Sequence, residues 1–460
     1  MREFDSLYFV GAGGIGMAAL ERYFLAKGKL VAGYDRTPSD LTRALQREGV
    51  HIDFDEDPAL IPDACRDPQR TLVVYTPAVP DSHQGLQYFR SNGFEVVKRA
   101  ALLGVVTQHS RGLCFAGTHG KTTTSSMAAH ILHSSGIGCN AFLGGVLRNY
   151  DSNFLLSTSS PYSVIEADEF DRSFHHLHPH VAVVTSTDPD HLDIYGTAEA
   201  YLESFAHFTE LIQPGGALIV HTGLALQPRV GEGVKTYTYS RDDGDFHAAN
   251  VRKGDGQISF DLVTPWETLS DISLGVPVDI NIENAIAAMA ACRLVDVPLE
   301  AMRNAVATFQ GPKRRFEFWL KEPGEHGKVM VDDYAHHPGE LRASISSVRD
   351  LYPGRRLTVI FQPHLYSRTR DFAPEFASAL SLADEVILLP IYPAREEPIP
   401  GVTSEIILQK VTSAKKIIYS KENLIKSIHL SNFDVLLTAG AGDIADLLPL
   451  IRDEFNKQEH

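Results

Sequence analysis

The sequence contains little cysteine, no excess of basic residues and no long apolar run. Its 4 cysteines are scattered through 460 residues, so they indicate reduced thiols rather than a disulfide framework. The net charge of −16 argues against non-specific nucleic-acid binding, which needs a basic surface to displace counterions. No run approaches the roughly 20 apolar residues of a membrane span, and the charged N-terminus is no signal peptide. We therefore expect a cytoplasmic protein with neither nucleic-acid nor membrane partners.

The length of 460 residues exceeds one ordinary hydrophobic core, and alternating strands and helices predict an α/β protein of three domains. We expect a Rossmann-like domain over 1–108, a central P-loop ATPase-like domain with a mixed sheet over 109–311, and a second Rossmann-like domain over 312–460. The first boundary lies in the linker-like stretch 107–112.

A phosphate-binding loop is predicted at residues 116–124, Ala-Gly-Thr-His-Gly-Lys-Thr-Thr-Thr. Gly117 and Gly120 allow backbone N–H groups to approach an anion. Lys121 supplies a charge for the outer phosphates, and the Thr122 hydroxyl can reach a magnesium ion. The candidate ATP-binding residues of the loop are Gly117, Thr118, His119, Gly120, Lys121, Thr122 and Thr123.

The loop departs from the usual Gly-x-x-x-x-Gly-Lys-Ser/Thr pattern, because Phe115 stands where that pattern has glycine. A well-capped helix N-terminus without a ligand is the alternative interpretation. The strand-like run 113–115 before the loop and the helical pattern 125–135 after it favour a nucleotide site.

A second glycine-rich turn, Gly-Ala-Gly-Gly-Ile-Gly at 11–16, lies between a predicted strand at 7–10 and a helical pattern. This context predicts a pyrophosphate on the helix N-terminus and a ribose hydroxyl near Asp35. It does not distinguish a nicotinamide cofactor from a uridine-diphosphate sugar, and a turn without ligand is the remaining alternative. The candidate residues of this site are Gly11, Gly13, Gly14, Ile15, Gly16, Asp35, Thr76, Pro77 and Ala78.

Acidic and histidine residues follow two strands of the predicted central domain. Glu166 ends an apolar strand near the phosphate loop, where a magnesium ligand would lie, since hard cations take oxygen ligands. His191 belongs to a run, 190–193, that suggests a second metal or phosphate contact; a solvated loop is the alternative. Asn281 and Asn284 share one helix face and could bind a base edge, although helix capping by Asn281 explains it equally well.

Strands and helices alternate again beyond residue 312, which is typical of another doubly wound domain. Polar residues follow three of these strands, at 332–338, 363–370 and 439–443. Ligands bind at the carboxyl ends of parallel strands, so we expect these loops to share one crevice. Cations there would suit a carboxylate or a transferred phosphoryl group.

The order of these motifs resembles that of the Mur ligases of bacterial peptidoglycan synthesis, over essentially the whole chain. The shared motifs are Gly-Ala-Gly-Gly-Ile-Gly-Met at 11–17, Gly-Thr-His-Gly-Lys-Thr-Thr at 117–123, Glu-Ala-Asp-Glu at 166–169, Asp-His-x-Asp at 190–193, Asn-x-x-Asn at 281–284, Arg-x-Glu at 315–317, Asp-Tyr-Ala-His-His-Pro at 333–338 and Phe-Gln-Pro-His at 361–364. The resemblance implies that ATP phosphorylates the lactyl carboxylate of UDP-N-acetylmuramate and that L-alanine attacks the acyl phosphate.

The resemblance also implies roles for individual residues. Lys121 would stabilise the moving phosphoryl group, Thr122 and Glu166 would hold one Mg²⁺, and His191 would serve a second metal site. Asn281 and Asn284 would hold the adenine, and the glycine turn 13–16 would hold the UDP diphosphate. The implied residues of the third domain are Arg315 and Asp333, which would reach the nucleotide, and Tyr334, His336, His364 and Arg368, which would frame the alanine.

Three positions depart from the family pattern. Ile280 stands where His is usual, and Ser186 stands where Asn is common. Leu365 replaces an Arg that many members place beside the amino acid, so the alanine carboxylate would rely on Arg368, Arg370 or another cation. The preference among alanine, serine and glycine is therefore open.

Three other functions compete with L-alanine ligation. A recycling ligase that attaches a preformed tripeptide to the same nucleotide sugar lies within the family; His119 and His336 favour the alanine enzyme. A nicotinamide-dependent dehydrogenase would leave the second phosphate loop and the third domain unused. An ATP-dependent binding switch would hydrolyse ATP whether or not UDP-N-acetylmuramate is present.

Overall fold

The computed structural model describes residues 4–76, 78–254, 256–322, 324, 327–394, 396–428 and 433–456. Contacts divide the chain into two compact units. The first unit holds 1–249, 261–270 and 283–307, and the second holds 250–260, 271–282 and 308–460. Each contains parallel-rich α/β sheets, as the alternating sequence pattern predicts.

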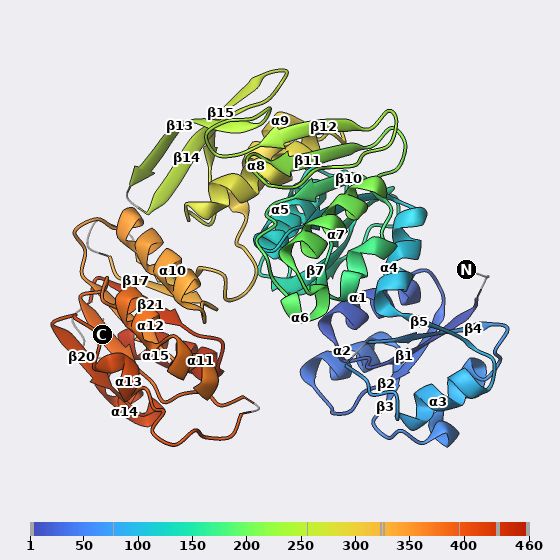
Figure 1. Ribbon diagram of the computed structural model, residues 1–460, viewed down its shortest axis with the longest axis horizontal. Helices are drawn as coiled ribbons and strands as arrows, with labels where there is room; N and C mark the ends of the chain where they lie inside the picture. The colour runs from blue at the N-terminus through green and yellow to red at the C-terminus, as the bar shows by residue number, and fades with distance from the viewer. Residues whose placement is uncertain are drawn as a thin grey trace. The chain divides into compact units, whose positions relative to one another are not determined.

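The first sheet is parallel and has the strand order β3-β2-β1-β4-β5. Its strands are β1 (Ser6–Val10), β2 (Leu30–Tyr34), β3 (His51–Asp53), β4 (Thr71–Tyr75) and β5 (Glu95–Lys98). Its helices are α1 (Ile15–Ala26), α2 (Asp40–Glu48), α3 (Gln84–Ser91) and α4 (Arg99–Gln108), with short 3₁₀ turns η1 (Pro58–Leu60) and η2 (Asp63–Cys65). This alternation is the predicted Rossmann-like arrangement (Figure 1).

The central sheet has the order β12-β11-β10-β6-β9-β7-β8, and its β7–β8 pair is antiparallel, so the sheet is mixed as predicted. Its strands are β6 (Arg111–Ala116), β7 (Asn140–Leu147), β8 (Ser152–Leu155), β9 (Tyr162–Glu166), β10 (Pro179–Val184), β11 (Ala217–His221) and β12 (Lys235–Tyr239). The accompanying helices are α5 (Lys121–Ser134), η3 (Phe170–His176), α6 (Leu192–Tyr195), α7 (Ala198–Glu210), α8 (Ile280–Arg293) and α9 (Leu299–Thr308). A three-stranded sheet contains β13 (His247–Gly254), β14 (Gln257–Val263) and β15 (Thr268–Ser273).

The stretch 107–112 is not the linker that the sequence suggested. Thr107 and Gln108 finish α4, and Arg111 already begins β6. Residues 109 and 110 lie between the two elements, and the apolar residues of α4 up to Val106 and those of β6 from Leu113 are largely buried. The proposed boundary at 108 coincides with the last residue of α4, just before the connection to β6.

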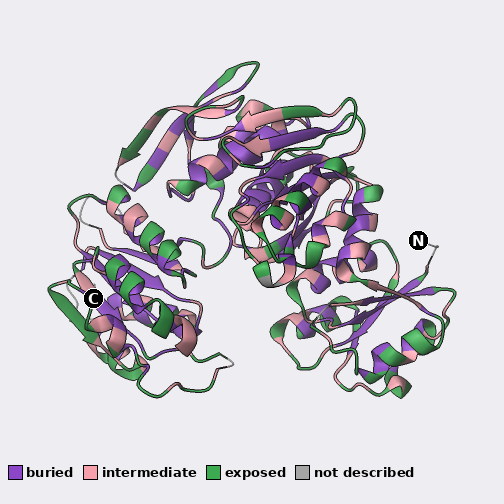
Figure 2. Cartoon of the chain, viewed as in Figure 1, coloured by how far each residue is buried: buried purple, intermediate pink, exposed green. Residues whose placement is uncertain are grey.

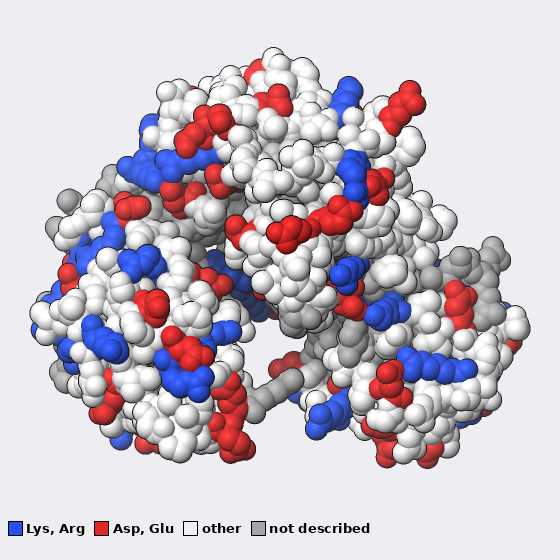
Figure 3. All heavy atoms as spheres, viewed as in Figure 1, with Lys and Arg blue, Asp and Glu red and all other residues white. Residues whose placement is uncertain are grey.

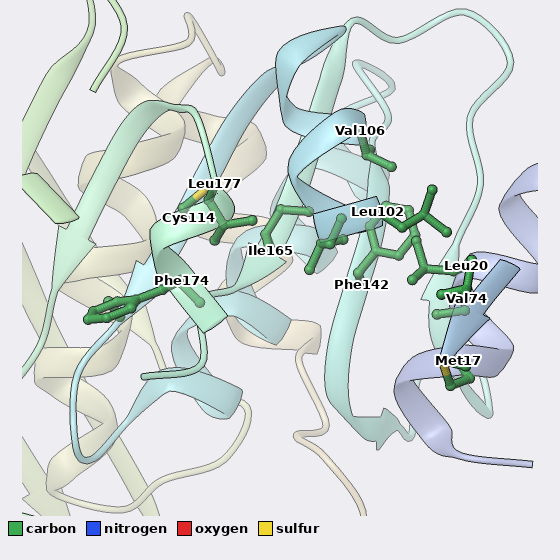
Figure 4. Packing of buried hydrophobic residues seen from close by; sticks show 14 of the residues in the cluster. Met17, Leu20, Val74, Leu102, Val106, Cys114, Phe142, Ile165, Phe174 and Leu177 are labelled. Carbon is green, nitrogen blue, oxygen red and sulfur yellow. The ribbon is translucent and has the colours of Figure 1, made fainter. Parts of the chain in front are cut away.

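One hydrophobic core continues from the first sheet to the central sheet. Figure 4 shows Met17 and Leu20 of α1, Leu102 of α4, Phe142 of β7 and Ile165 of β9 within this cluster. Helix α1 packs against β7, and α4 packs against η3. Burial of large apolar side chains contributes about 1.5–3 kcal/mol each, so the core holds the N-terminal glycine turn in a defined place relative to β7 and β9.

The second unit contains a six-stranded sheet with the order β16-β17-β21-β18-β19-β20, in which the β16–β17 pair is antiparallel. Its strands are β16 (Glu317–Lys321), β17 (Val329–Asp333), β18 (Leu357–Phe361), β19 (Glu385–Leu388), β20 (Lys415–Ile418) and β21 (Val435–Ala439). Its helices are α10 (Pro338–Leu351), α11 (Tyr366–Asp371), α12 (Ala373–Leu380), α13 (Glu405–Leu408), α14 (Lys421–Ser427), η5 (Asp443–Leu447) and α15 (Leu448–Asn456).

The distribution of burial and charge follows the layered α/β pattern. Figure 2 shows largely buried sheet strands beside helices that expose one face. On the face seen in Figure 3, Lys and Arg side chains are interspersed with Asp and Glu. Among the described residues, no helix is both long and apolar enough to cross a membrane.

Glu21 carries its carboxyl group on the buried side of α1. Its side chain is 0% exposed, and neither carboxyl oxygen has a hydrogen-bond partner among the described residues. Burial raises the pKa of Glu21 well above its ordinary value, Asp35 and Glu48 add to the rise, and Arg22 opposes it. The folded protein therefore favours a neutral Glu21.

We predict that Glu21→Gln stabilises the protein more at pH 8 than at pH 5. A raised folded-state pKa contributes stability that is present below the unfolded pKa and is lost as the pH rises towards the folded pKa. Glutamine has no proton to lose, so the variant escapes that loss. Thermal unfolding at both pH values measures the difference, and Glu199→Gln, exposed on α7, is the control. A gain independent of pH would contradict the prediction.

Candidate active site

The phosphate loop lies between the end of β6 and the start of α5. Gly117 and Gly120 have φ angles of +140° and +83°, in a region that side chains disfavour. A Cβ atom at 117 would lie 2.1 Å from Thr185 Oγ1, and one at 120 would lie 2.9 Å from Asn284 Oδ1. Helix α5 begins without a capping side chain or an acidic first turn, so its N–H groups are available to an anion.

Residues that follow β10 hold the loop in place. Thr185 Oγ1 donates to the carbonyl oxygen of His119 at 2.5 Å, and the His119 N–H donates to Ser186 Oγ at 2.7 Å. Thr118 Oγ1 donates to the carbonyl oxygen of Asp188 at 2.7 Å. Ser186, a departure from the family pattern, thus supplies the acceptor for the loop backbone.

Lys121 and Glu169 form an ion pair beside the loop. Lys121 Nζ lies 2.8 Å from Glu169 Oε2 and donates to the carbonyl oxygen of Gly117 at 2.6 Å. The Glu169 side chain is only 2% exposed. The sequence indicates no role for Glu169, since an acid three residues after Glu166 carries no separate signal.

The structure brings the two proposed magnesium ligands together. Thr122 Oγ1 donates to Glu166 Oε1 at 3.0 Å, and the Gly144 N–H donates to Glu166 Oε2 at 2.9 Å. Burial raises the pKa of Glu166, and these two donors, with the charge of Lys121, oppose that rise. A cation would hold the carboxylate ionised for the same electrostatic reason.

Histidine 191 occupies the turn before α6, with a φ of +50°. Its N–H donates to Asp190 Oδ1 at 2.7 Å, and its ring centroid lies 5.2 Å from that of Phe170. Among the described residues, no hydrogen bond joins His191 to Thr122 or Glu166. Nor do those residues contain a group of three or more His, Cys, Asp or Glu that could hold a metal ion.

The asparagine pair of α8 has two different environments. Asn284 Oδ1 accepts a hydrogen bond of 3.1 Å from Thr124 Oγ1, which ties α8 to the helix of the phosphate loop. Asn281 Nδ2 donates to the carbonyl oxygen of Val276 at 3.1 Å. Asn281 lies inside the first turn of α8 rather than at its N-cap.

The N-terminal glycine turn also ends in an uncapped helix. Gly14 is the N-cap of α1 and has no side chain with which to cap the helix. The first turn of α1 contains no acidic residue. The Gly13 N–H donates to Asp35 Oδ2 at 2.6 Å, so Asp35 accepts a hydrogen bond from the backbone of the turn.

Gly11 and Thr76, both predicted for the sugar-nucleotide site, lie close together. A Cβ at Gly11 would lie 2.6 Å from Thr76 Cγ2. Ala78 is exposed, and Pro77 lies outside the described residues.

A cavity of about 210 Å³ lies between the start of α1 and the end of β9. It is lined by Ile15, Gly16, Ala19, Arg99, Leu103, Phe142, Leu143, Gly144, Glu166 and Asp168. A Cβ at Gly16 would lie 2.6 Å from Arg99 Nη1, so this cation faces the start of α1. The sequence alone did not indicate a role for Arg99, because a basic residue at the start of a helix gives no sign of what it faces.

In the second unit, Asp333 ends β17 next to Tyr334. The Ser344 hydroxyl donates to Asp333 Oδ2. Burial raises the pKa of Asp333 to about 6, against the opposing effects of Ser344 and Arg315. Arg315 is exposed, and its guanidinium lies 6.0 Å from the centroid of the Tyr334 ring.

Arg314 has a structural role that the sequence did not indicate. Its Nε donates to Asp332 Oδ2 at 3.0 Å, and its other nitrogens donate to the carbonyl oxygens of Gly440 and Gly442. The Asp332 side chain is 0% exposed. Arg314 thus ties β17 to the loop after β21 and leaves its neighbour Arg315 exposed.

The residues proposed to frame alanine cluster within the second unit. The His336 ring lies 5.2 Å from Tyr334 and 6.0 Å from His364, centroid to centroid. Arg368 Nη1 and His364 Nδ1 are buried atoms without a hydrogen-bond partner among the described residues. Burial and neighbouring positive charge lower the pKa of His364. Leu365 adopts a φ of +69° at the start of α11.

Comparison with protein families covers the three parts of the chain in order. Residues 6–111 match the Mur ligase family, catalytic domain; 115–292 match the Mur ligase middle domain; and 314–442 match the Mur ligase, glutamate ligase domain. The chain is 59% identical over 454 residues to UDP-N-acetylmuramate--L-alanine ligase of Parabacteroides distasonis, with 98% of each chain covered. It is 45% identical over 457 residues to the ligase of that name from Flavobacterium johnsoniae, with 99% of each covered. The chain belongs to the Mur ligase family.

Solved structures have the same fold. The UDP-N-acetylmuramate-alanine ligase MurC of Thermotoga maritima aligns with a TM-score of 0.78 at 24% identity, covering 98% of this chain and 99% of that one. A murein peptide ligase of Psychrobacter arcticus aligns with a TM-score of 0.61 at 22% identity, covering 97% and 99%. The three-domain α/β architecture predicted from the sequence is thereby confirmed.

We predict that Gly117→Ala destabilises the protein by more than the roughly 1–2 kcal/mol that left-handed backbone alone costs. The added Cβ would collide with the Thr185 hydroxyl and with backbone atoms of Ser186. Gly136→Ala is the matched control, since Gly136 has a φ of +82° but nothing within 4 Å. Denaturant unfolding measures both; equal losses would contradict the steric argument.

Proposed function

We propose that this chain is an ATP-dependent ligase that joins L-alanine to the lactyl carboxylate of UDP-N-acetylmuramate in peptidoglycan precursor synthesis. The observation that carries the proposal is the cavity that runs from Gly16 to Glu166, beside the phosphate loop. It offers one end to a sugar nucleotide and the other to a transferred phosphoryl group. The full-length relatives named as L-alanine ligases support this substrate choice.

The reaction has three steps. A lactyl carboxylate oxygen attacks the γ-phosphorus of ATP, and ADP leaves. The amine of L-alanine then attacks the acyl phosphate to give a tetrahedral intermediate, which releases phosphate and forms the amide. Lys121 and the free N–H groups of α5 offset the charge of the moving phosphoryl group.

Thr122 and Glu166 are the proposed ligands of a magnesium ion. Their oxygen atoms suit a hard cation, and two protein ligands suffice because Mg²⁺ keeps several waters and binds phosphate oxygens. When bound, the ion neutralises charge on the phosphates. We assign His191 to a second metal site beside the acyl phosphate.

The remaining assignments follow the motifs. The turn 11–16, with Asp35 and the 76–78 turn, holds the UDP group, and Asn281 and Asn284 hold the adenine. Arg315 and Asp333 are the proposed catalytic residues of the second unit. The domain boundaries at 108 and 311 and a cytoplasmic location belong to the same proposal.

The alanine carboxylate is assigned to Arg368 and His364. Both have a buried nitrogen without a partner among the described residues, and such groups cost stability until a ligand satisfies them. Tyr334 and His336 complete the pocket. Leu365 contributes an apolar surface where a cation is common in the family.

The competing functions have less support. The curated relatives compared above are named for L-alanine rather than a tripeptide. A nicotinamide-dependent dehydrogenase would give no function to the phosphate loop, to Glu166 or to the second unit.

Phosphate release from ATP, measured with UDP-N-acetylmuramate and one amino acid or tripeptide at a time, distinguishes the L-alanine ligase from the tripeptide ligase. Release that is indifferent to UDP-N-acetylmuramate would reject both and favour an ATP-dependent switch.

We predict that Lys121→Ala lowers amide formation by at least about 100-fold, the scale of losing a charge that stabilises the transition state. Binding of UDP-N-acetylmuramate should remain, because the N-terminal glycine turn does not involve Lys121. Calorimetry measures the binding, and product analysis measures the ligation. A folded variant with the wild-type rate would disprove the assignment.

We predict that Arg99→Ala raises the KM for UDP-N-acetylmuramate roughly tenfold, the scale of one charge-assisted hydrogen bond. The KM for ATP should change little, since Arg99 faces Gly16. Arg43→Ala is the control, because Arg43 carries the same charge on the surface of α2, paired with Asp40. Equal effects of both variants would show that only overall charge matters.

A further inference from the structure

The ammonium group of Lys121 is held by acceptors of the protein itself. Its Nζ donates to the carbonyl oxygen of Gly117 at 2.6 Å and to Glu169 Oε1 at 2.9 Å, whereas its contact with the carbonyl oxygen of Thr118 is 3.5 Å long. An ammonium group has three N–H donors. Two are therefore committed at full hydrogen-bond length, and the third is the one that a phosphate oxygen can take.

This ion pair is shielded from water. The side chains of Lys121 and Glu169 are 14% and 2% exposed. A charge pair in such surroundings interacts more strongly than one at the surface, where water screens the attraction. Lys121 therefore has a fixed direction before any nucleotide arrives.

The backbone that presents Glu169 is itself fixed. The Glu169 carbonyl oxygen accepts hydrogen bonds from the Tyr195 hydroxyl and from the Arg172 N–H. Asp171 and Arg172 follow with φ angles of 52° and 54°, a conformation that persists only where surrounding contacts impose it. Lys98 pairs with Asp171 at 2.6 Å, and the Arg172 guanidinium lies 4.7 Å from the centroid of the Tyr195 ring.

We propose that Glu169 is a positioning residue that directs Lys121 at the phosphates of ATP. The inference rests on the proposed function, because it takes Lys121 to bind those phosphates. The two glutamates of one motif then have separate tasks: Glu166 accepts from Thr122, and Glu169 orients Lys121. A lysine held by a glutamate is also required for phosphoryl transfer in protein kinases.

A double-mutant cycle tests whether Glu169 acts through Lys121. Calorimetry on the full chain gives the Kd of MgATP for the wild type, Glu169→Ala, Lys121→Met and the double variant. We expect Glu169→Ala to weaken ATP binding roughly 10-fold and to lower kcat while the KM for UDP-N-acetylmuramate stays unchanged. In the Lys121→Met background, the second substitution should have no further effect on the Kd.

Two gentler variants keep the test decisive if Glu169→Ala fails to fold. Glu169→Gln retains an acceptor without the charge, and Tyr195→Phe removes the hydroxyl that holds the Glu169 carbonyl. Each should weaken ATP binding less than Glu169→Ala, and each effect should vanish with Lys121→Met. Glu199→Ala, on the exposed face of α7, should leave the Kd unchanged.

Two results would overturn the inference. One is equal or tighter ATP binding by the Glu169 variants: equal binding would show that Glu169 does not direct Lys121, and tighter binding would make Glu169 a competitor of the nucleotide. The other is an equal loss in the Lys121→Met background, which would make its effect merely structural. A wild-type protein that does not bind ATP would contradict the proposed function as well, whereas ATP binding with additive losses contradicts only the role of Glu169.

Discussion

The apolar core shared by the first and central sheets is the constraint on which the candidate site depends. Phe142 belongs to this core and also lines the cavity, two residues before the Gly144 N–H that holds Glu166. Leu103 of α4 has the same double role. Close-packed interiors transmit strain rather than absorb it, so the glycine turn and Glu166 keep a set separation. A substrate that must present a diphosphate and a carboxylate at two fixed points requires that rigidity.

Anion binding in a protein with a net charge of −16 depends on local arrangement. The uncapped starts of α1 and α5 direct N–H groups outward, and Arg99 and Lys121 add one cation near each. The acids nearby accept hydrogen bonds from the protein: Asp35 accepts from the Gly13 N–H, and Glu166 accepts from Thr122 and from the Gly144 N–H. Because screening is weak in such partly buried sites, these few contacts outweigh the distant surface charges.

The sequence predicted the elements and the loops, because each has a local signal. A strand was expected at 7–10 and is found as β1 at Ser6–Val10, since a short apolar run and flanking breakers define a strand without knowledge of its neighbours. The rule that ligands gather at carboxyl strand ends predicted Glu166 near the phosphate loop, and Thr122 of that loop donates to Glu166. By contrast, the continuous core and the ion pair of Glu169 join residues far apart in the chain. Such contacts depend on how side chains pack, which no local pattern records, and the stretch 107–112 was mistaken for a linker for the same reason.

The segment around Leu365 shows how a departure from a family pattern acquires a physical explanation. A φ of +69° with a ψ of 137° is unfavourable for a residue with a branched side chain. The Leu365 N–H donates to the carbonyl oxygen of Tyr392, and its own carbonyl oxygen accepts from Thr369, so the backbone on both sides imposes the conformation. The unfavourable backbone conformation at position 365 is therefore imposed by the hydrogen bonds of the loop and not by the leucine side chain. In the proposed function, an uncharged side chain there leaves the recognition of a carboxylate to Arg368 and His364, whose buried nitrogens lack partners among the described residues.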